Sequence, residues 1–290
     1  MTVLLQLING VQVGAIYALV ALGYSMVYGI IKLINFAHGD IIMVGAYVVW
    51  FLMARLLFPA WAAVILAIAF CACLGMAIEK IAYKPLRNSP RISLLITAIG
   101  ISFLLQNLAQ VIFTANPRMF TNVFPGSIRL GGSTLSVATL VTIVVSVLLM
   151  AGLSFLVNRT KIGRAMRAVS EDKATAELMG INVNNTISFT FALGSGLAAV
   201  AAVLYCCSYS QINPTMGSML GLKAFVAAVL GGIGSIPGAM VGGFIIGIAE
   251  SFTKGYISSK LADAVVFGIL ILVLLIKPVG ILGRGKREKV

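Results

Sequence analysis

The run from Leu4 to Ile31 decides the class of fold, and it reads LLQLINGVQVGAIYALVALGYSMVYGII. It contains no charged residue over its whole length. Because about 20 apolar residues are enough for a helix to cross the hydrocarbon core of a bilayer, this run is long enough to span a membrane. It has neither the basic flank nor the small-residue cleavage site of a secretory signal, so we expect it to stay in the membrane.

The rest of the chain continues in the same way. Of its 290 residues, 60% are hydrophobic and 10% are charged, and the mean hydropathy is +1.06. A water-soluble fold could not bury so much apolar surface, and a barrel would show alternating segments instead of long apolar runs. The sequence therefore predicts an all-α polytopic membrane protein with about eight transmembrane helices in a single domain, residues 1–290. Further apolar spans run at about 41–57, 61–81, 94–113, 135–157, 187–207, 219–230, 240–252 and 261–276.

The charged residues predict which ends of the spans face the cytoplasm. The formal net charge is +13, and most basic residues lie in short segments between or after apolar spans. Basic segments of this kind are typical of cytoplasmic loops. We therefore expect the loop 158–186 and the basic tail 277–290 to be cytoplasmic, which places the N-terminus outside by alternation. Nucleic-acid binding is not expected, because no aromatic residues accompany the basic ones in a groove-like pattern.

Short or broken helices are expected near residues 32–40 and 219–252, where polar residues, glycines and proline interrupt apolar runs. Irregular backbone at membrane depth needs protein or a wet cavity around it, so paired breaks indicate a translocation pathway. A plain cytoplasmic turn explains the first break equally well, and turn or capping roles are open for His38 and Asp40. Interhelical hydrogen bonds are an alternative role for the polar residues of the first run. The candidate pathway residues are Asn9, Gln12, Asn35, His38, Gly39, Asp40, Gly231, Gly232, Gly234 and Pro237.

The loop 158–186 contains the signals of a complete short helix. Ser170 is a candidate N-cap, and Glu171 and Asp172 would place negative charge in the first turn. Gly180 stands where a left-handed residue ends a helix, with Ile181 able to contact Ala176. Ala174 and Leu178 share a face, with Met179 beside them. Such a helix could dock into a groove on another protein, or it could lie on the lipid surface or on its own bundle.

Few charged residues fall inside the predicted spans, and this bears on the energy source. Glu250 precedes Lys254 by four residues, which favours a helical ion pair near the outer surface. An ion-coupled carrier usually needs a buried carboxylate, and the chain offers only Glu250, Asp40 and neutral oxygens. It also shows no nucleotide-binding, catalytic or metal-binding motif. Energy for transport is therefore expected to come from another polypeptide.

Three stretches resemble bacterial ABC-transporter permeases of the branched-chain amino acid family: residues 164–181, residues 28–40 with 45–47, and residues 230–239. The first is similar to the loop that these permeases insert into an ATPase subunit, which gives residues 170–180 a coupling role. The resemblance implies a multi-subunit importer of the inner membrane. Its other members would be a second homologous permease, two cytoplasmic ATPases that bind ATP and Mg²⁺, and a periplasmic binding protein. Urea and short-chain amide permeases share much of this pattern and remain alternatives, as does, less strongly, an ion-coupled carrier.

Overall fold

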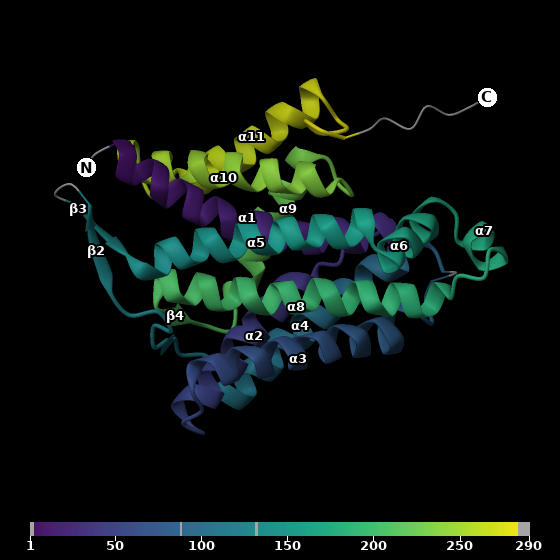
Figure 1. Cartoon of the computed structure of the whole chain (residues 1–290), viewed down its shortest axis with the longest axis horizontal. Helices are drawn as coiled ribbons and strands as arrows, with labels where there is room; N and C mark the ends of the chain where they lie inside the picture. Colours follow the sequence, from purple (N-terminus) through teal and green to yellow (C-terminus); the bar gives the residue numbers. More distant parts are fainter. Residues whose placement is uncertain (1–2, 88, 131–132, 284–290) are drawn as a thin grey trace.

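The computed structural model describes residues 3–87, 89–130 and 133–283, and most of them form helices that run along one long axis (Figure 1). Seven segments within these residues are long and apolar enough to cross a membrane, and two further apolar helices, Met216–Gly231 and Ala262–Ile276, are shorter. The helices are α1 (Val3–Ile31), α2 (Ala37–Ala54), α3 (Ala60–Ile78), the π-helical turn η1 (Glu79–Tyr83), α4 (Arg91–Phe113), α5 (Val137–Arg159), α6 (Lys161–Glu171), α7 (Lys173–Leu178), α8 (Val183–Tyr209), α9 (Met216–Gly231), α10 (Ile236–Tyr256) and α11 (Ala262–Ile276).

The two ends of the bundle differ. One end, called here the hairpin end, carries the N-terminal start of α1 and the strands β2 (Ser127–Leu130) and β3 (Ser133–Ser136), which pair with each other. Two shorter strands, β1 (Arg118–Met119) and β4 (Gln211–Ile212), pair antiparallel. The opposite end, called the α7 end, carries α6 and α7 (Figure 1). The start of α1 and the predicted coupling loop thus lie at opposite ends, as the alternation of spans requires.

Glycines allow α1 and α10 to pack with their backbones in contact. The position where a methyl group on Gly247 would lie is occupied by the backbone of Gly14, and the backbone of Ala18 occupies the same position at Gly243. Gly242 packs in the same way on the backbone of α9. Small residues permit this approach in membranes, where van der Waals packing drives helix association. These glycines therefore act in packing within the bundle.

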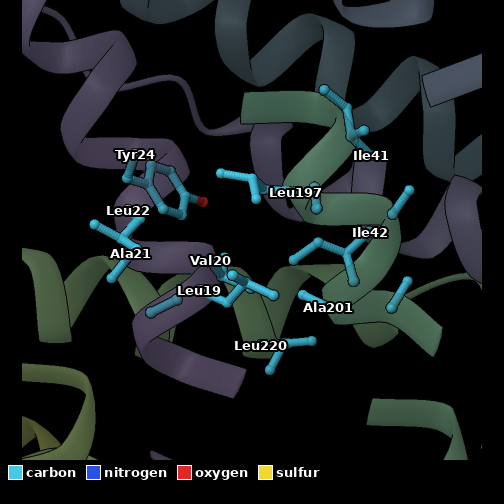
Figure 2. Packing of buried hydrophobic residues seen from close by; sticks show 14 of the residues in the cluster. Leu19, Val20, Ala21, Leu22, Tyr24, Ile41, Ile42, Leu197, Ala201 and Leu220 are labelled. Carbon is cyan, nitrogen blue, oxygen red and sulfur yellow. The ribbon is translucent and has the colours of Figure 1, made fainter. Parts of the chain in front are cut away.

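The centre of the core is formed by four helices. Large apolar side chains of α1 and α2 meet α8 and α9 there, and they are almost completely buried. Figure 2 shows part of this cluster and labels Leu19, Val20, Ala21, Leu22, Tyr24, Ile41, Ile42, Leu197, Ala201 and Leu220.

The first predicted break lies inside the bundle. After α1 ends at Ile31, the chain turns back before α2 begins at Ala37. The His38 ring fills the space left by the missing side chain of Gly23, and Gly194 faces the same place. Because Gly194 lies near the middle of α8, α2 starts at about half the depth of the bundle. The plain surface turn is therefore the wrong interpretation of residues 32–40.

The second break consists of one short helix and a tight turn. α9 is the short helix, whereas α10 extends well beyond the apolar run 240–252 and is long enough to cross a membrane. The turn between them uses positive φ angles of +107° at Gly232 and +87° at Gly234, which glycine adopts without strain. Ser235 then caps α10, and Pro237 stands in its first turn, where a proline costs no hydrogen bond.

The C-terminal segment is attached to this turn. The backbone N–H groups of Ile281 and Leu282 donate to the carbonyls of Leu230 and Gly231. Residues 277–283 are therefore packed against the end of α9 instead of forming a free tail. The rest of the predicted basic tail, residues 284–290, lies outside the described residues.

Candidate functional site

The predicted site residues lie in three places along the axis: a helix at the α7 end, the interior where α2 and α9 begin, and a cavity at the hairpin end. The structure does not bring the candidate pathway residues together. Asn9 and Gln12 lie in the cavity, residues 35–40 lie at half depth, and residues 231–237 form the turn near the α7 end.

At the α7 end, the short helix α7, for which a coupling role is predicted, is capped at both ends, but its start differs from the predicted one. Asp172 is the N-cap, because its Oδ1 accepts from the N–H of Thr175 at 2.8 Å. This hydrogen bond holds the pKa of the Asp172 carboxyl below its ordinary value. Ser170 was expected to cap this helix, but it lies in the last turn of α6 and donates to the carbonyl of Arg167 at 2.7 Å.

The expected position of Glu171 is also wrong, because this residue ends α6 and does not enter the first turn of α7. The physical reason is that α6 has an apolar face of its own. Met166 and Val169 are buried on that face, and they hold the helix together for three turns. The chain can bend only after Glu171, where Asp172 has extended backbone.

The end of α7 is formed as the sequence predicts. Gly180 has a φ of +80°, the N–H of Ile181 donates to the Ala176 carbonyl at 3.0 Å, and the N–H of Gly180 donates to Glu177 at 2.9 Å. These two bonds define a Schellman motif. Leu178 is 87% exposed and Met179 is 78% exposed. The motif therefore presents two large apolar side chains at the tip of the molecule.

A small cleft lies between α6 and the α9–α10 turn. Its volume is about 80 Å³, and it is lined by residues of α1, α5, α6 and the start of α10. Met166 and Ser170 of α6 lie on one side, and Gly234 and Ile236 lie on the other. α6 and the α9–α10 turn thus face each other across this cleft.

The interior site forms where the first turns of α2 and α9 meet. The backbones of Gly39 and Gly217 are in direct contact, which leaves no room for a side chain at either position. Tyr83 donates to Asn35 Oδ1 at 2.8 Å and so holds the segment that precedes α2. Neither His38 nor Asp40 caps α2, because the N-cap residue is Phe36 and no side chain caps this helix.

The side chain of Asp40 reaches α4. Its Oδ1 accepts from Gln106 Nε2 at 2.9 Å, and the same nitrogen lies 2.9 Å from Ser218 Oγ on α9. Sequence reasoning missed these partners, because nothing in the local pattern relates residues that lie 66 and 112 positions apart.

At the hairpin end, α1, α8 and α10 enclose a polar cavity of about 360 Å³. Gln12 forms interhelical hydrogen bonds, the alternative role considered for the polar residues of the first run. Its side-chain amide donates to Ser208 Oγ at 2.6 Å and accepts from Thr139 at 3.0 Å. The cavity is lined by Gln6, Asn9, Gln12, Val13, Ser208, Tyr209, Glu250, Ser251, Lys254 and Gly255.

An ion network borders this cavity. The expected pair of Glu250 and Lys254 is present at 2.6 Å, and Lys223 joins it at 2.8 Å from Glu250. Lys223 also lies 2.6 Å from Asp263 Oδ1 in α11. The structure adds Lys223 to this network, a residue for which the sequence suggested no partner. A second interior ion pair joins Glu79 to Arg87 near the α7 end.

The whole chain resembles known permeases. The family model described as the branched-chain amino acid transport system / permease component matches residues 6–274. The chain is 46% identical to the high-affinity branched-chain amino acid transport system permease protein BraD of Pseudomonas aeruginosa, over 98% of this chain and 97% of that protein. It is 45% identical to the corresponding LivH of Escherichia coli K12, with the same two shares.

The similarity extends to an archaeal protein. The probable branched-chain amino acid transport permease protein LivH of Methanocaldococcus jannaschii is 33% identical over 91% of this chain and 88% of its own length. The family model's match, residues 6–274, runs from the first turn of α1 into α11 and agrees with the bundle of long apolar helices. The chain therefore belongs to the family of permease components of branched-chain amino acid transport systems.

Proposed function

We propose that this chain is a membrane-spanning permease subunit of an ATP-driven importer that carries branched-chain aliphatic amino acids across the bacterial cytoplasmic (inner) membrane. The observation that carries the proposal is the capped helix α7, whose Leu178 and Met179 are 87% and 78% exposed at one tip of the molecule. An apolar tip on a rigid short helix fits a groove on a partner protein. The names of relatives at 45–46% identity support the substrate class.

The proposed importer needs partner subunits for ATP hydrolysis, for the second half of the membrane part and for delivery of the amino acid. Two cytoplasmic ATPases would bind ATP and Mg²⁺ and would receive α7, so that this chain needs no cofactor of its own. A second homologous permease would complete the membrane part, and a periplasmic binding protein would deliver the amino acid at the hairpin end. In this arrangement the α7 end and the C-terminus are cytoplasmic, in keeping with the basic residues around them.

The proposed mechanism links α7 to the interior of the bundle through α6. Closure of the ATPases on ATP would move α7, and α6 would transmit this movement across the small cleft to Gly234 and Ile236. The movement would continue along α9 to the contact of Gly217 with Gly39. One ligand-dependent movement would thus shift the equilibrium between conformations open to opposite sides.

Transport by the reconstituted complex tests this function. Proteoliposomes with both permeases, the ATPases and the binding protein are expected to accumulate leucine, isoleucine and valine only when ATP is supplied. Binding of these amino acids, urea and short amides to the isolated binding protein identifies the substrate class. Uptake by this chain alone under an ion gradient would overturn the proposal in favour of a secondary carrier, and uptake of urea or amides alone would overturn the substrate class.

A further inference from the structure

Asp40 differs from the other carboxylates in the long helices and their immediate continuation. Glu79 is paired with Arg87, and Glu250 is paired with two lysines. Within the described part of the chain, no ion pair is formed by Asp40, although its residue is only 1% exposed. It lies two residues after His38, at about half the depth of the bundle. A carboxylate at this depth that has only neutral partners indicates a functional site.

The surroundings of Asp40 contain more hydrogen-bond acceptors than donors. Gln106 Nε2 lies within hydrogen-bond distance of three oxygens: Asp40 Oδ1 at 2.9 Å, Ser218 Oγ at 2.9 Å and Ser102 Oγ at 3.1 Å. The amide nitrogen has two hydrogens and each serine hydroxyl has one, and the Ser102 hydroxyl is itself a partner of Asp40. The carboxylate alone can accept about four bonds, and each hydroxyl oxygen can accept two more. The cluster therefore has free acceptor capacity around a negative charge, and an ammonium group, with three donors and no acceptor, would satisfy it.

This cluster extends from the buried Asp40 to the outer face of the bundle. Ser218 is exposed, and Gln106 is half-buried. One turn further along α9, on the same side as Ser218, Leu222 is 38% exposed, and Met219 beside it is 48% exposed. Hydrocarbon cannot satisfy a carboxylate and hydroxyl groups, so this face must border protein or water. The second permease, which the proposed function includes, would close this face and leave a wet passage along it.

We propose that Asp40, Ser102, Gln106 and Ser218 form a transit site for the ammonium group of the transported amino acid, and that Leu222 and Met219 contact its aliphatic side chain. The proposal rests on the proposed function, because it takes a zwitterionic aliphatic solute as the cargo. The site matches the two parts of the cargo: the negative polar cluster would receive the ammonium group, and the adjacent apolar surface would contact the aliphatic side chain. Its single unpaired charge suits brief occupation during passage.

The first experiment separates charge from shape at Asp40. Uptake of leucine and ATP hydrolysis are measured in the complete reconstituted complex with Asp40→Asn and with Asp40→Glu. The proposal expects Asp40→Asn to lower uptake about tenfold or more, the effect of one lost hydrogen bond to a charged group, while ATP hydrolysis continues. Asp40→Glu, which keeps the charge, is expected to retain more uptake. Higher uptake with Asp40→Asn than with Asp40→Glu would overturn the proposal. That result would indicate a packing role, because asparagine has the same shape as aspartate.

The second experiment tests whether the face is wet, and it does not depend on the identity of the cargo. Ser218→Cys and Leu222→Cys are introduced with Cys73→Ala, since Cys73 is the exposed one of the four free cysteines. Both new cysteines are expected to react with a membrane-impermeant, charged thiol reagent in the assembled complex. Val144→Cys on α5, an apolar position that is 55% exposed, is the control on another helix and should stay unreacted. Unreacted cysteines at 218 and 222 would overturn the proposal even if Asp40→Asn fails to assemble.

The two proposals fail in different ways. If the wild-type complex shows no ATP-dependent uptake of branched-chain amino acids, the proposed function is wrong. If the wild type transports leucine and Asp40→Asn transports it equally well, the transit site alone is wrong. Uptake that depends on a sodium or proton gradient in the wild type and loses this dependence in Asp40→Asn would assign Asp40 to a cation instead, and would also overturn the transit site.

Discussion

The ammonium group of Lys223 lies 2.8 Å from Glu250 Oε1 and joins the short helix α9 to α10 inside the bundle. Both side chains are buried, with exposed fractions of 8% and 1%. Tyr17 donates to the second oxygen of Glu250 at 2.6 Å and adds α1 to this contact. α9 begins at half depth and is too short to cross the membrane, and this contact joins its glycine contacts in fixing its position along the axis.

Removing the charge of Glu250 is therefore expected to destabilise the bundle. Glu250→Gln removes the buried carboxylate partner of Lys223 and leaves it with Asp263, whose side chain is 47% exposed. Breaking a buried pair costs about 3–5 kcal/mol, and the remaining partner places this variant at the lower end of that range. Lys254→Met removes a partner that is 37% exposed and is expected to cost about 1 kcal/mol or less. Thermal unfolding of the detergent-solubilised permease measures the difference. Equal effects of the two substitutions would show that Lys223 does not depend on Glu250.

The contact of α1 with α10 leads to a second prediction. A side chain on Gly247 would overlap the backbone of Gly14, so Gly247→Val must push the two helices apart. Overpacking of a close backbone contact is expected to cost about 3 kcal/mol or more. Gly268→Val on α11 is the matched control, because nothing lies within 4 Å of its methyl position. The yield of monodisperse protein and its melting temperature report the effect, and a stable Gly247→Val variant would refute this packing.

Local features of this chain were predictable from sequence, whereas distant contacts were not. The end of α7 at Gly180 was predicted because a Schellman motif is encoded within a few residues. The start of α7 was predicted incorrectly, because Ser170 and Asp172 are equally good caps and the choice depends on how α6 packs through Met166 and Val169.

The interior contacts depend on where helices begin along the axis, and a pattern of apolar runs does not contain this information. The break before α2 was visible as a polar stretch, but its depth in the bundle was not. The partners of Asp40 and Lys223 lie across helices, at separations of 66 and 27 residues. In the sequence, Lys223 is a lone charge within the apolar run 219–230, and only the geometry identifies it as the partner of Glu250.

Gly180 provides a third prediction, on coupling. Its φ of +80° is strained by about 1–2 kcal/mol for a residue with a Cβ, and more for a β-branched one. Nothing lies within 4 Å of its methyl position, so any effect is conformational and not steric. Gly180→Val is expected to lower the amino acid transported per ATP hydrolysed, because the tip with Leu178 and Met179 would shift. Gly180→Asn tolerates this backbone and should stay coupled; equal ratios for both variants would contradict the role of α7.

The start of α7 provides a fourth prediction, which distinguishes the role of Asp172 from that of Ser170. Asp172→Ala removes the acceptor for the N–H of Thr175 and is expected to lower the transport-to-hydrolysis ratio by roughly fivefold, on the scale of a lost cap. Asp172→Asn retains an acceptor oxygen and should stay close to the wild type. Ser170→Ala should have little effect, since its hydroxyl bonds only within α6.

The pH dependence of this cap has a definite sign. The folded-state pKa of Asp172 is lowered, so its contribution is complete above the ordinary aspartate pKa of about 3.9 and is lost as the pH falls through the lower folded value. Coupled uptake should therefore show no titration from Asp172 between about pH 5.5 and 8. To test this, the amino acid transported per ATP hydrolysed is measured for Asp172→Asn and for the wild type across this pH range, and the ratio of the two values is followed. A ratio that changes with pH would mean that the carboxyl titrates near neutrality, which the hydrogen bond from Thr175 opposes.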